Sequence, residues 1–191
     1  MKYPCKTPIN FFNLTKPHIY YWLRFSKNFD WGRENQGGKL PGLASGDNCS
    51  GGDVCDGTNG FTARMMWRDG GSAVLYLYHM DKPGKYGEDI PLTYEKGDQV
   101  VFDKEKWYKI SERVKVNTGD DHNGEVQVWV NNKPVLEKKG VRFVNDGSKI
   151  DNFYISSFHG GADKSWSPRE DCYIWYDDWV ISTKRDDVVE E

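Results

Sequence analysis

The chain has 191 residues, a formal net charge of −3 and 29% charged side chains. This length suits one domain over residues 1–191, and the near-balanced charge lacks the basic excess of a nucleic-acid-binding protein. No apolar run approaches the length of a membrane span, so we expect no membrane partner. Glycine is abundant, aromatic residues reach 15%, and alanine and leucine are scarce. This composition excludes an all-helical protein.

Short runs of alternating apolar and polar residues recur along the chain, separated by Gly, Asp, Asn or Pro, and no crossover-helix pattern follows them. The pattern is typical of an antiparallel sandwich or barrel. The tail over residues 184–191 is charged, and we expect it to fray. The predicted strands cover residues 18–25, 60–68, 73–80, 107–116, 125–130, 149–158 and 172–182.

The four cysteines allow three pairings. Cys49 and Cys55 bracket a glycine-rich loop, and Cys5 and Cys172 lie near opposite ends of the chain, so we favour the disulfides Cys49–Cys55 and Cys5–Cys172. Four free thiols in a reducing compartment are the alternative, and zinc is disfavoured because no CxxC or HxxxH spacing occurs. No secretory signal is visible; an extracellular or virus-associated protein is the expectation.

The segment 60–80 predicts a hairpin whose loop is Asp69-Gly70-Gly71. With a three-residue loop, Arg64 faces Tyr76 and Thr62 faces Tyr78, and all four side chains project to one side of the sheet. A two-residue loop would flip one strand and destroy this polar patch. Just upstream, Lys39 stands in a glycine-rich, proline-stiffened segment.

Tyrosines beside cations suit the β-elimination of a uronic acid. The C5 proton of a uronate is weakly acidic, and a cation that neutralises the adjacent carboxylate stabilises the enolate-like intermediate. Tyrosine can act as base or acid if nearby cations lower its pKa from about 10. The product would be an unsaturated sugar formed without water.

Several motifs resemble polysaccharide lyase family 14, which contains alginate lyases and glucuronate-polymer lyases. The resemblance spans nearly the whole chain. Its most specific part is the string Gly37-Gly38-Lys39-Leu40-Pro41-Gly42-Leu43. The strand 61–68, the Tyr76-x-Tyr78 pair and the segment 153–161 also match. The resemblance implies a β-jelly roll of two antiparallel sheets packed as a sandwich, with a concave cleft for an anionic polysaccharide.

The resemblance also implies site residues. Lys39, Arg64, Tyr76 and Tyr78 match the family's essential lysine, its arginine and its paired tyrosines, and we predict them as catalytic. We favour Tyr78 as base and acid and Tyr76 as its partner. Predicted substrate-binding residues are Thr62, which stands where a serine is usual, Arg68, and His159, which departs from the family pattern.

Two other functions compete with a lyase. A noncatalytic carbohydrate-binding module could use the same aromatic and cationic face, since fold does not fix function. A sandwich glycoside hydrolase needs paired carboxylates, and Asp103-x-Glu105, the clearest pair, reads as a solvated turn. We expect no required cofactor and no catalytic metal; a structural Ca²⁺ is conceivable, although no Asp-rich ligand string is present. We expect a monomer.

Overall fold

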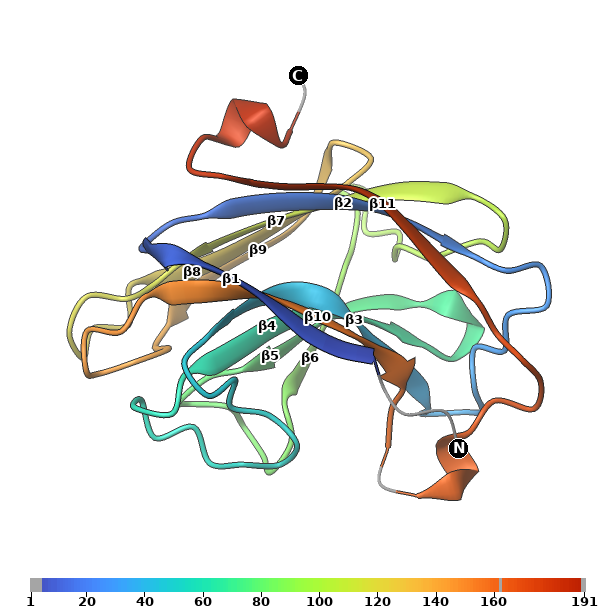
Figure 1. Cartoon of the computed structure of the whole chain (residues 1–191), viewed down its shortest axis with the longest axis horizontal. Coiled ribbons are helices and arrows are strands. Elements are labelled where there is room, and N and C mark those ends of the chain that lie inside the picture. Colours follow the sequence, from blue (N-terminus) through green and yellow to red (C-terminus); the bar gives the residue numbers. More distant parts are fainter. Residues whose placement is uncertain (1–4, 162, 190–191) are drawn as a thin grey trace.

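The structure is a computed structural model that describes residues 5–161 and 163–189, with only the backbone for residues 5–7 and 12. Two antiparallel sheets pack face to face as a sandwich (Figure 1). One sheet has six strands in the order β1-β10-β3-β4-β5-β6 and the other has five in the order β11-β2-β7-β8-β9. The predicted all-β sandwich is therefore confirmed.

The strands of the six-stranded sheet are β1 (Cys5–Leu14), β3 (Gly37–Ser45), β4 (Phe61–Arg68), β5 (Ala73–Tyr78), β6 (Glu88–Pro91) and β10 (Ile150–His159). Those of the five-stranded sheet are β2 (His18–Phe25), β7 (Trp107–Lys115), β8 (Gly124–Val130), β9 (Lys133–Val141) and β11 (Ile174–Ser182). Three short 3-10 helices, η1 (Asp69–Gly71), η2 (Lys164–Trp166) and η3 (Arg185–Asp187), lie in connections and near the C-terminus. Within the described residues no helix is long and apolar enough to cross a membrane.

The core lies between the two sheets and draws on alternate residues of both. Leu23 and Phe25 of β2 and Ala63, Met65 and Trp67 of β4 are among its fully buried members. Strands β4 and β5 are buried on both faces, because their outer face carries a second apolar cluster that includes Met66, Val74, Tyr76 and Tyr78. The central strands thus form a rigid floor for whatever lies on the outer face of this sheet.

The predicted hairpin has the expected register. Arg64 pairs with Tyr76 and Thr62 pairs with Tyr78 across β4 and β5. The connection is the three-residue segment η1, in which Gly70 adopts φ 67°, a left-handed conformation that glycine tolerates at no steric cost. The polar patch therefore lies on one face, as predicted.

Strand β3 contains a bulge that aims Lys39. Lys39 pairs with Met66 and Gly42 pairs with Arg64, so two residues of β3, Leu40 and Pro41, stand opposite the single residue Met65 of β4. Pro41 sits inside the bulge, where a missing N–H does least harm to the sheet. The glycine-rich, proline-stiffened segment is thus a central strand. Its ladder of hydrogen bonds is interrupted at Pro41, which has no N–H to donate.

Side chains from the opposite sheet satisfy the backbone groups that this bulge turns inward. The Tyr21 hydroxyl donates to the Pro41 carbonyl at 3.0 Å, and the Leu43 N–H donates to Glu112 Oε2 at 3.3 Å. Glu112 is fully buried, and burial raises the pKa of its carboxyl well above the ordinary value. Tyr21 and Glu112 therefore fix the shape of β3 from behind.

The C-terminal segment differs from the expectation of a frayed tail over the part that the structure describes. After η3, Val188 and Val189 are buried against Trp129, with Tyr20 and Val180 packed nearby. The Val188 carbonyl also accepts a hydrogen bond from Ser111 Oγ at 2.9 Å. Two valines at the end of a charged run are sufficient to anchor it on the five-stranded sheet.

One of the two predicted disulfides is present. Cys49 and Cys55 are bonded, as predicted. The Cys5–Cys172 disulfide is wrong for this structure, because Cys172 is a free thiol whose sulfur accepts the Asp30 N–H at 3.1 Å. The backbone of Cys5 pairs with β10 in the six-stranded sheet, whereas Cys172 precedes β11 in the other sheet; the side chain of Cys5 lies outside the described part.

Candidate active site

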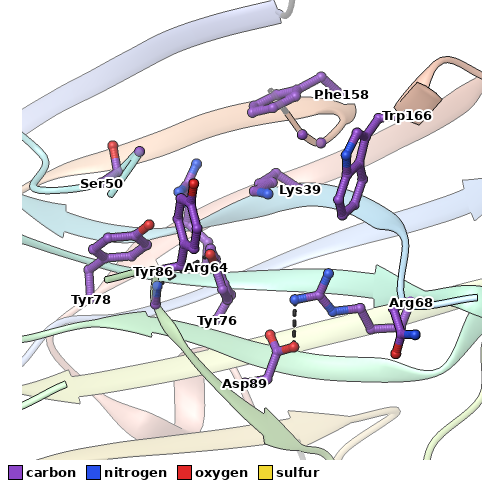
Figure 2. Close-up of a pocket in the computed structure, with 15 residues that line it drawn as sticks. Lys39, Ser50, Arg64, Arg68, Tyr76, Tyr78, Tyr86, Asp89, Phe158 and Trp166 are labelled. Carbon is purple, nitrogen blue, oxygen red and sulfur yellow. Dashed lines mark hydrogen bonds and ion pairs between the residues drawn. The ribbon is translucent and has the colours of Figure 1, made fainter. Parts of the chain in front are cut away.

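A cleft of about 550 Å³ lies on the outer face of the six-stranded sheet. Its floor comes from β3, β4 and β5, and its walls come from the loop after β3, the loop before β6 and the segment after β10 (Figures 1 and 2). The predicted residues Lys39, Arg64, Arg68, Tyr76 and Tyr78 all line it. The other lining residues are Asn35, Ser50, Gly51, Tyr86, Gly87, Asp89, Phe158, Gly160, Gly161 and Trp166.

Arg64 is a buried cation at the bottom of the cleft. It is 3% exposed, and burial lowers the pKa of its guanidinium. One terminal nitrogen donates to Ser156 Oγ at 3.2 Å, the guanidinium lies 5.3 Å from the centre of the Tyr154 ring, and Nε has no hydrogen-bond partner. No carboxylate of the described residues pairs with it. A buried charge without an opposite charge is costly, so this position favours an anionic ligand.

Backbone groups orient both tyrosine hydroxyls. The Gly52 N–H donates to Tyr78 Oη at 3.0 Å, and the Gly87 N–H donates to Tyr76 Oη at 3.2 Å. These backbone donors fix the positions of both oxygens. Gly52 lies in the loop that the Cys49–Cys55 disulfide closes, so this disulfide helps to position Tyr78.

The electrostatics of Tyr76 differ from the sequence-based expectation. Burial, followed by the neighbouring Tyr78 hydroxyl, raises the pKa of Tyr76 above its usual value of 10. Lys39 and Arg68 approach the ring, with Nζ and Cζ 5.0 Å and 5.7 Å from its centre. The expected lowering of this pKa by nearby cations is therefore wrong, because the cations lie over the ring while desolvation dominates. Tyr76 stays protonated and is suited to donating a proton or hydrogen bond.

Lys39 projects from β3 into the cleft, between Phe158 and Tyr76 (Figure 2). Its Nζ lies 5.6 Å from the centre of the Phe158 ring, on the side opposite Tyr76. Gly160 leaves it the space it occupies, since a Cβ at that position would lie 2.5 Å from Lys39 Nζ. The Gly160-Gly161 pair therefore leaves room for Lys39 and, at Gly161, for the packing of Trp166.

Arg68 stands at the other end of the cleft, where it forms an ion pair with Asp89 (Figure 2). Asp89 is the one carboxylate among the lining residues. A glycoside hydrolase needs two carboxyl groups across the scissile bond. The described residues that line the cleft do not supply such a pair, and Asp103 and Glu105 lie elsewhere, in an exposed turn.

Two predicted substrate-binding residues do not line the cleft. Thr62 is on the predicted face but fully buried, and its hydroxyl donates to the Cys49 carbonyl at 3.1 Å, so it anchors the disulfide loop. His159 points to the opposite face, where its ring packs on Phe29 and Trp67 and Nε2 lies 2.7 Å from the Asp30 carbonyl oxygen. Burial lowers the pKa of His159. These positions correct the prediction that Thr62 and His159 contact the substrate.

Sequence reasoning missed Phe158, Trp166 and Tyr86. The alternation of β10 contained a signal for Phe158: Ser156 and Phe158 share one face, and His159 necessarily takes the other. Trp166 and Tyr86 come from irregular segments, for which alternation offers no guide. Among the described residues no group of three or more His, Cys, Asp or Glu side chains is arranged to hold a metal ion. That the protein needs no cofactor stays a prediction.

The fold and the cleft together define a sandwich protein whose cleft is lined by cationic and aromatic side chains. The model of the family described as polysaccharide lyase 14 matches residues 10–179. The chain belongs to this family and is a polysaccharide lyase. Comparison with curated protein sequences finds no match.

Solved structures support this assignment. The chain is 32% identical to the alginate lyase Aly36B over 97% of its own length and 75% of that chain, with a TM-score of 0.80. The same lyase has been solved as a variant with an alginate tetrasaccharide bound. A marine alginate lyase from Aplysia kurodai is 27% identical over 90% of this chain and 71% of that one, with a TM-score of 0.74.

A more distant structure agrees in fold alone. The endo-β-1,4-glucuronan lyase of Trichoderma reesei is 13% identical, with a TM-score of 0.62 over 97% of this chain and 76% of that one. This likeness shows a shared fold.

Proposed function

We propose that the protein cleaves a uronic-acid polymer, alginate or glucuronan, by β-elimination in this cleft. The observation that carries the proposal is the buried Arg64, which has no carboxylate partner among the described residues. A uronate carboxylate at this position would neutralise the guanidinium and in turn be neutralised by it. The alginate oligosaccharides bound in the related structures support the same substrate class.

The residues of the cleft can be assigned to the steps of the reaction. Arg64 holds the carboxylate and stabilises the negative charge that develops when the C5 proton leaves. Tyr78, as the phenolate, takes that proton and then, as the phenol, returns it to the glycosidic oxygen as the C4–O bond breaks and the C4=C5 double bond forms. Tyr76, which burial keeps protonated, donates a hydrogen bond to the same charge. Lys39 places a second positive charge beside it.

The noncatalytic alternative fits the cleft less well. A binding module needs only stacking surfaces and cations, whereas here two tyrosine hydroxyls are held by backbone N–H groups at 3.0 and 3.2 Å beside a buried arginine. Such preorganisation of dissociable groups is what proton transfer requires. The Cys49–Cys55 disulfide supports an oxidising, extracellular setting.

Substitution of single hydroxyls tests these roles. Tyr78→Phe and Tyr76→Phe should each lower turnover by roughly 10²–10⁴-fold, the usual loss for a general acid or base, with little change in folding. Tyr94→Phe removes a hydroxyl from a partly exposed tyrosine outside the cleft and should leave turnover unchanged. A Tyr76→Phe, Tyr78→Phe protein that releases unsaturated uronate at a near-native rate would end this mechanism and transfer the base role to Lys39.

A further inference from the structure

The outer face of the five-stranded sheet carries a row of aromatic and basic side chains far from the cleft. In β11, β2 and β7, Trp175 pairs with Arg24 and Arg24 pairs with Trp107. Directly opposed residues project to the same side of a sheet. Leu23 and Phe25, which flank Arg24 along β2, both point into the core. The row Trp175–Arg24–Trp107 therefore faces outward, on the opposite side of the sandwich from the catalytic cleft.

The aromatic side chains of this row are unusually exposed. Trp107 is 41% exposed and Trp175 is 45% exposed, and Tyr173, 53% exposed, stacks on Trp175 with ring centres 6.4 Å apart and an interplanar angle of 26°. Single exposed apolar residues are common on protein surfaces, but aligned ones mark interaction sites. The two tryptophans stand two strand spacings apart, about 10 Å, across an antiparallel sheet.

Arg24, at the centre of the row, can bind an anionic group of a ligand. Its guanidinium lies 5.5 Å from the centre of the Trp175 ring. Its ion pair with Glu105 is long, at 3.9 Å, and the Arg24 side chain is 36% exposed. An arginine packed against an aromatic face can still bind a carboxylate with two hydrogen bonds from its terminal nitrogens.

We propose that the row Trp175–Arg24–Trp107, with Tyr173, is a second, noncatalytic binding surface for a uronic-acid polymer. Such a polymer presents apolar sugar faces interspersed with carboxylates, and this order matches the sequence of ring, guanidinium and ring across the three strands. This proposal depends on the proposed function only for the class of polymer that is bound. The surface would hold a long chain on the enzyme while the cleft on the other side cuts it or another chain.

A second copy of the protein is the competing occupant of this face. A twofold contact centred on this row would bring the two Arg24 side chains of the two copies together, and like charges that face each other across an interface are unfavourable. A polyuronate would instead supply carboxylates to Arg24. Charge complementarity therefore favours an anionic sugar polymer.

The test separates polymer binding from cleavage. The full chain carrying Trp107→Ala and Trp175→Ala, and a separate Arg24→Gln variant, are compared with the unchanged protein in gels that contain a polyuronate or a neutral glucan, and in lyase assays on long polymer and on short oligouronates. We expect about tenfold weaker retention by the polyuronate and a similar rise in KM for the long polymer, the size expected from losing two aromatic contacts. Turnover of oligouronates should not change.

Three controls keep the result interpretable. Trp107→Tyr with Trp175→Tyr keeps the aromatic faces and should restore retention, which separates binding from any loss of folding. Val101→Ala removes an equally exposed apolar side chain elsewhere and should have no effect. A Lys39→Ala protein should still be retained by polyuronate through the row, so retention can be scored even if the proposed cleavage is absent.

Unchanged retention in the double tryptophan variant would overturn the proposal. Equal retention by the neutral glucan would overturn it as well, because Arg24 would then have no role. A dimer seen by light scattering that the tryptophan substitutions dissolve would assign the face to a second copy instead.

Discussion

The most informative single substitution is Gly160→Ala, because it adds one methyl group beside one functional atom. The nearest atoms to a Cβ at this position are Lys39 Nζ at 2.5 Å, Cδ at 2.9 Å and Cε at 3.2 Å. Ordinary contact begins at 3.4 Å, so Nζ must move by about 0.9 Å (3.4 − 2.5). A displacement of about 1 Å in a positioned catalytic group costs on the order of 10²-fold in rate.

The same change should leave the fold intact. The clash involves the far end of a flexible side chain, and Gly160 does not occupy the left-handed backbone region, so alanine fits there without strain. Replacement of glycine at a compatible site changes stability by roughly 0.4–1 kcal/mol, often favourably. The midpoint of thermal unfolding should therefore shift by no more than about 4 °C for a chain of this size.

The assay is steady-state release of unsaturated uronate by Gly160→Ala and by the matched control Gly84→Ala. A Cβ at Gly84 meets no atom within 4 Å, and the position is not left-handed. We expect kcat to fall by about 10²-fold in the first variant and to stay unchanged in the second. A Gly160→Ala enzyme with native kcat and native stability would refute the reasoning that Lys39 must occupy its observed position.

Three further predictions follow from the structure. Burial raises the pKa of Tyr76, so turnover should not decline on the alkaline side below about pH 10; a decline near pH 8 in a pH–rate profile would contradict its role as a protonated donor. Buried Glu112 has a raised pKa, so folding takes up a proton above the unfolded value and stability falls by about 1.4 kcal/mol per pH unit until the folded pKa is reached. Glu112→Gln removes this slope, and its melting temperature should exceed that of the unchanged protein by a margin that grows as the pH rises above the ordinary pKa of a glutamate carboxyl; a constant margin would show that Glu112 is ionised in the fold. Reduction of the Cys49–Cys55 disulfide frees the loop whose Gly52 N–H contacts Tyr78, so kcat measured well below the melting temperature should fall. The melting temperature should fall by several degrees as well, since a disulfide contributes roughly 2–4 kcal/mol, and unchanged kcat in the reduced protein would show that the loop is held by other contacts.

Much of the fold was predictable because the alternation of apolar and polar residues along a strand indicates the face of the sheet on which each side chain lies. The predicted strand over residues 18–25 coincides with β2, and the hairpin of β4 and β5 has the predicted register and loop. Strand β3 was not recognised, since glycine and proline disfavour strands. Its stability depends on Tyr21 and Glu112, which lie far away in sequence and act across the sandwich. Local pattern cannot reveal such support.

The part of the site that lies on a single hairpin could be predicted from the sequence. Arg64, Tyr76 and Tyr78 follow from register alone, and the family resemblance added Lys39. Thr62 was placed on the correct face but is covered by the loop that Cys49 and Cys55 close, and sequence alternation does not say what covers a face. The direction of the Tyr76 pKa shift failed for a related reason, because desolvation depends on packing around the ring.

The central claim is that this cleft breaks a uronic-acid polymer by elimination, and mass analysis of the products tests it most directly. The purified protein is incubated with alginate and with glucuronan, and the new oligosaccharide ends are weighed and examined for ultraviolet absorbance. Elimination predicts absorbing ends, each one water lighter than a hydrolysis product, and their loss in the Tyr76→Phe, Tyr78→Phe protein. Products that carry the added water, or no product from either polymer, would contradict the account.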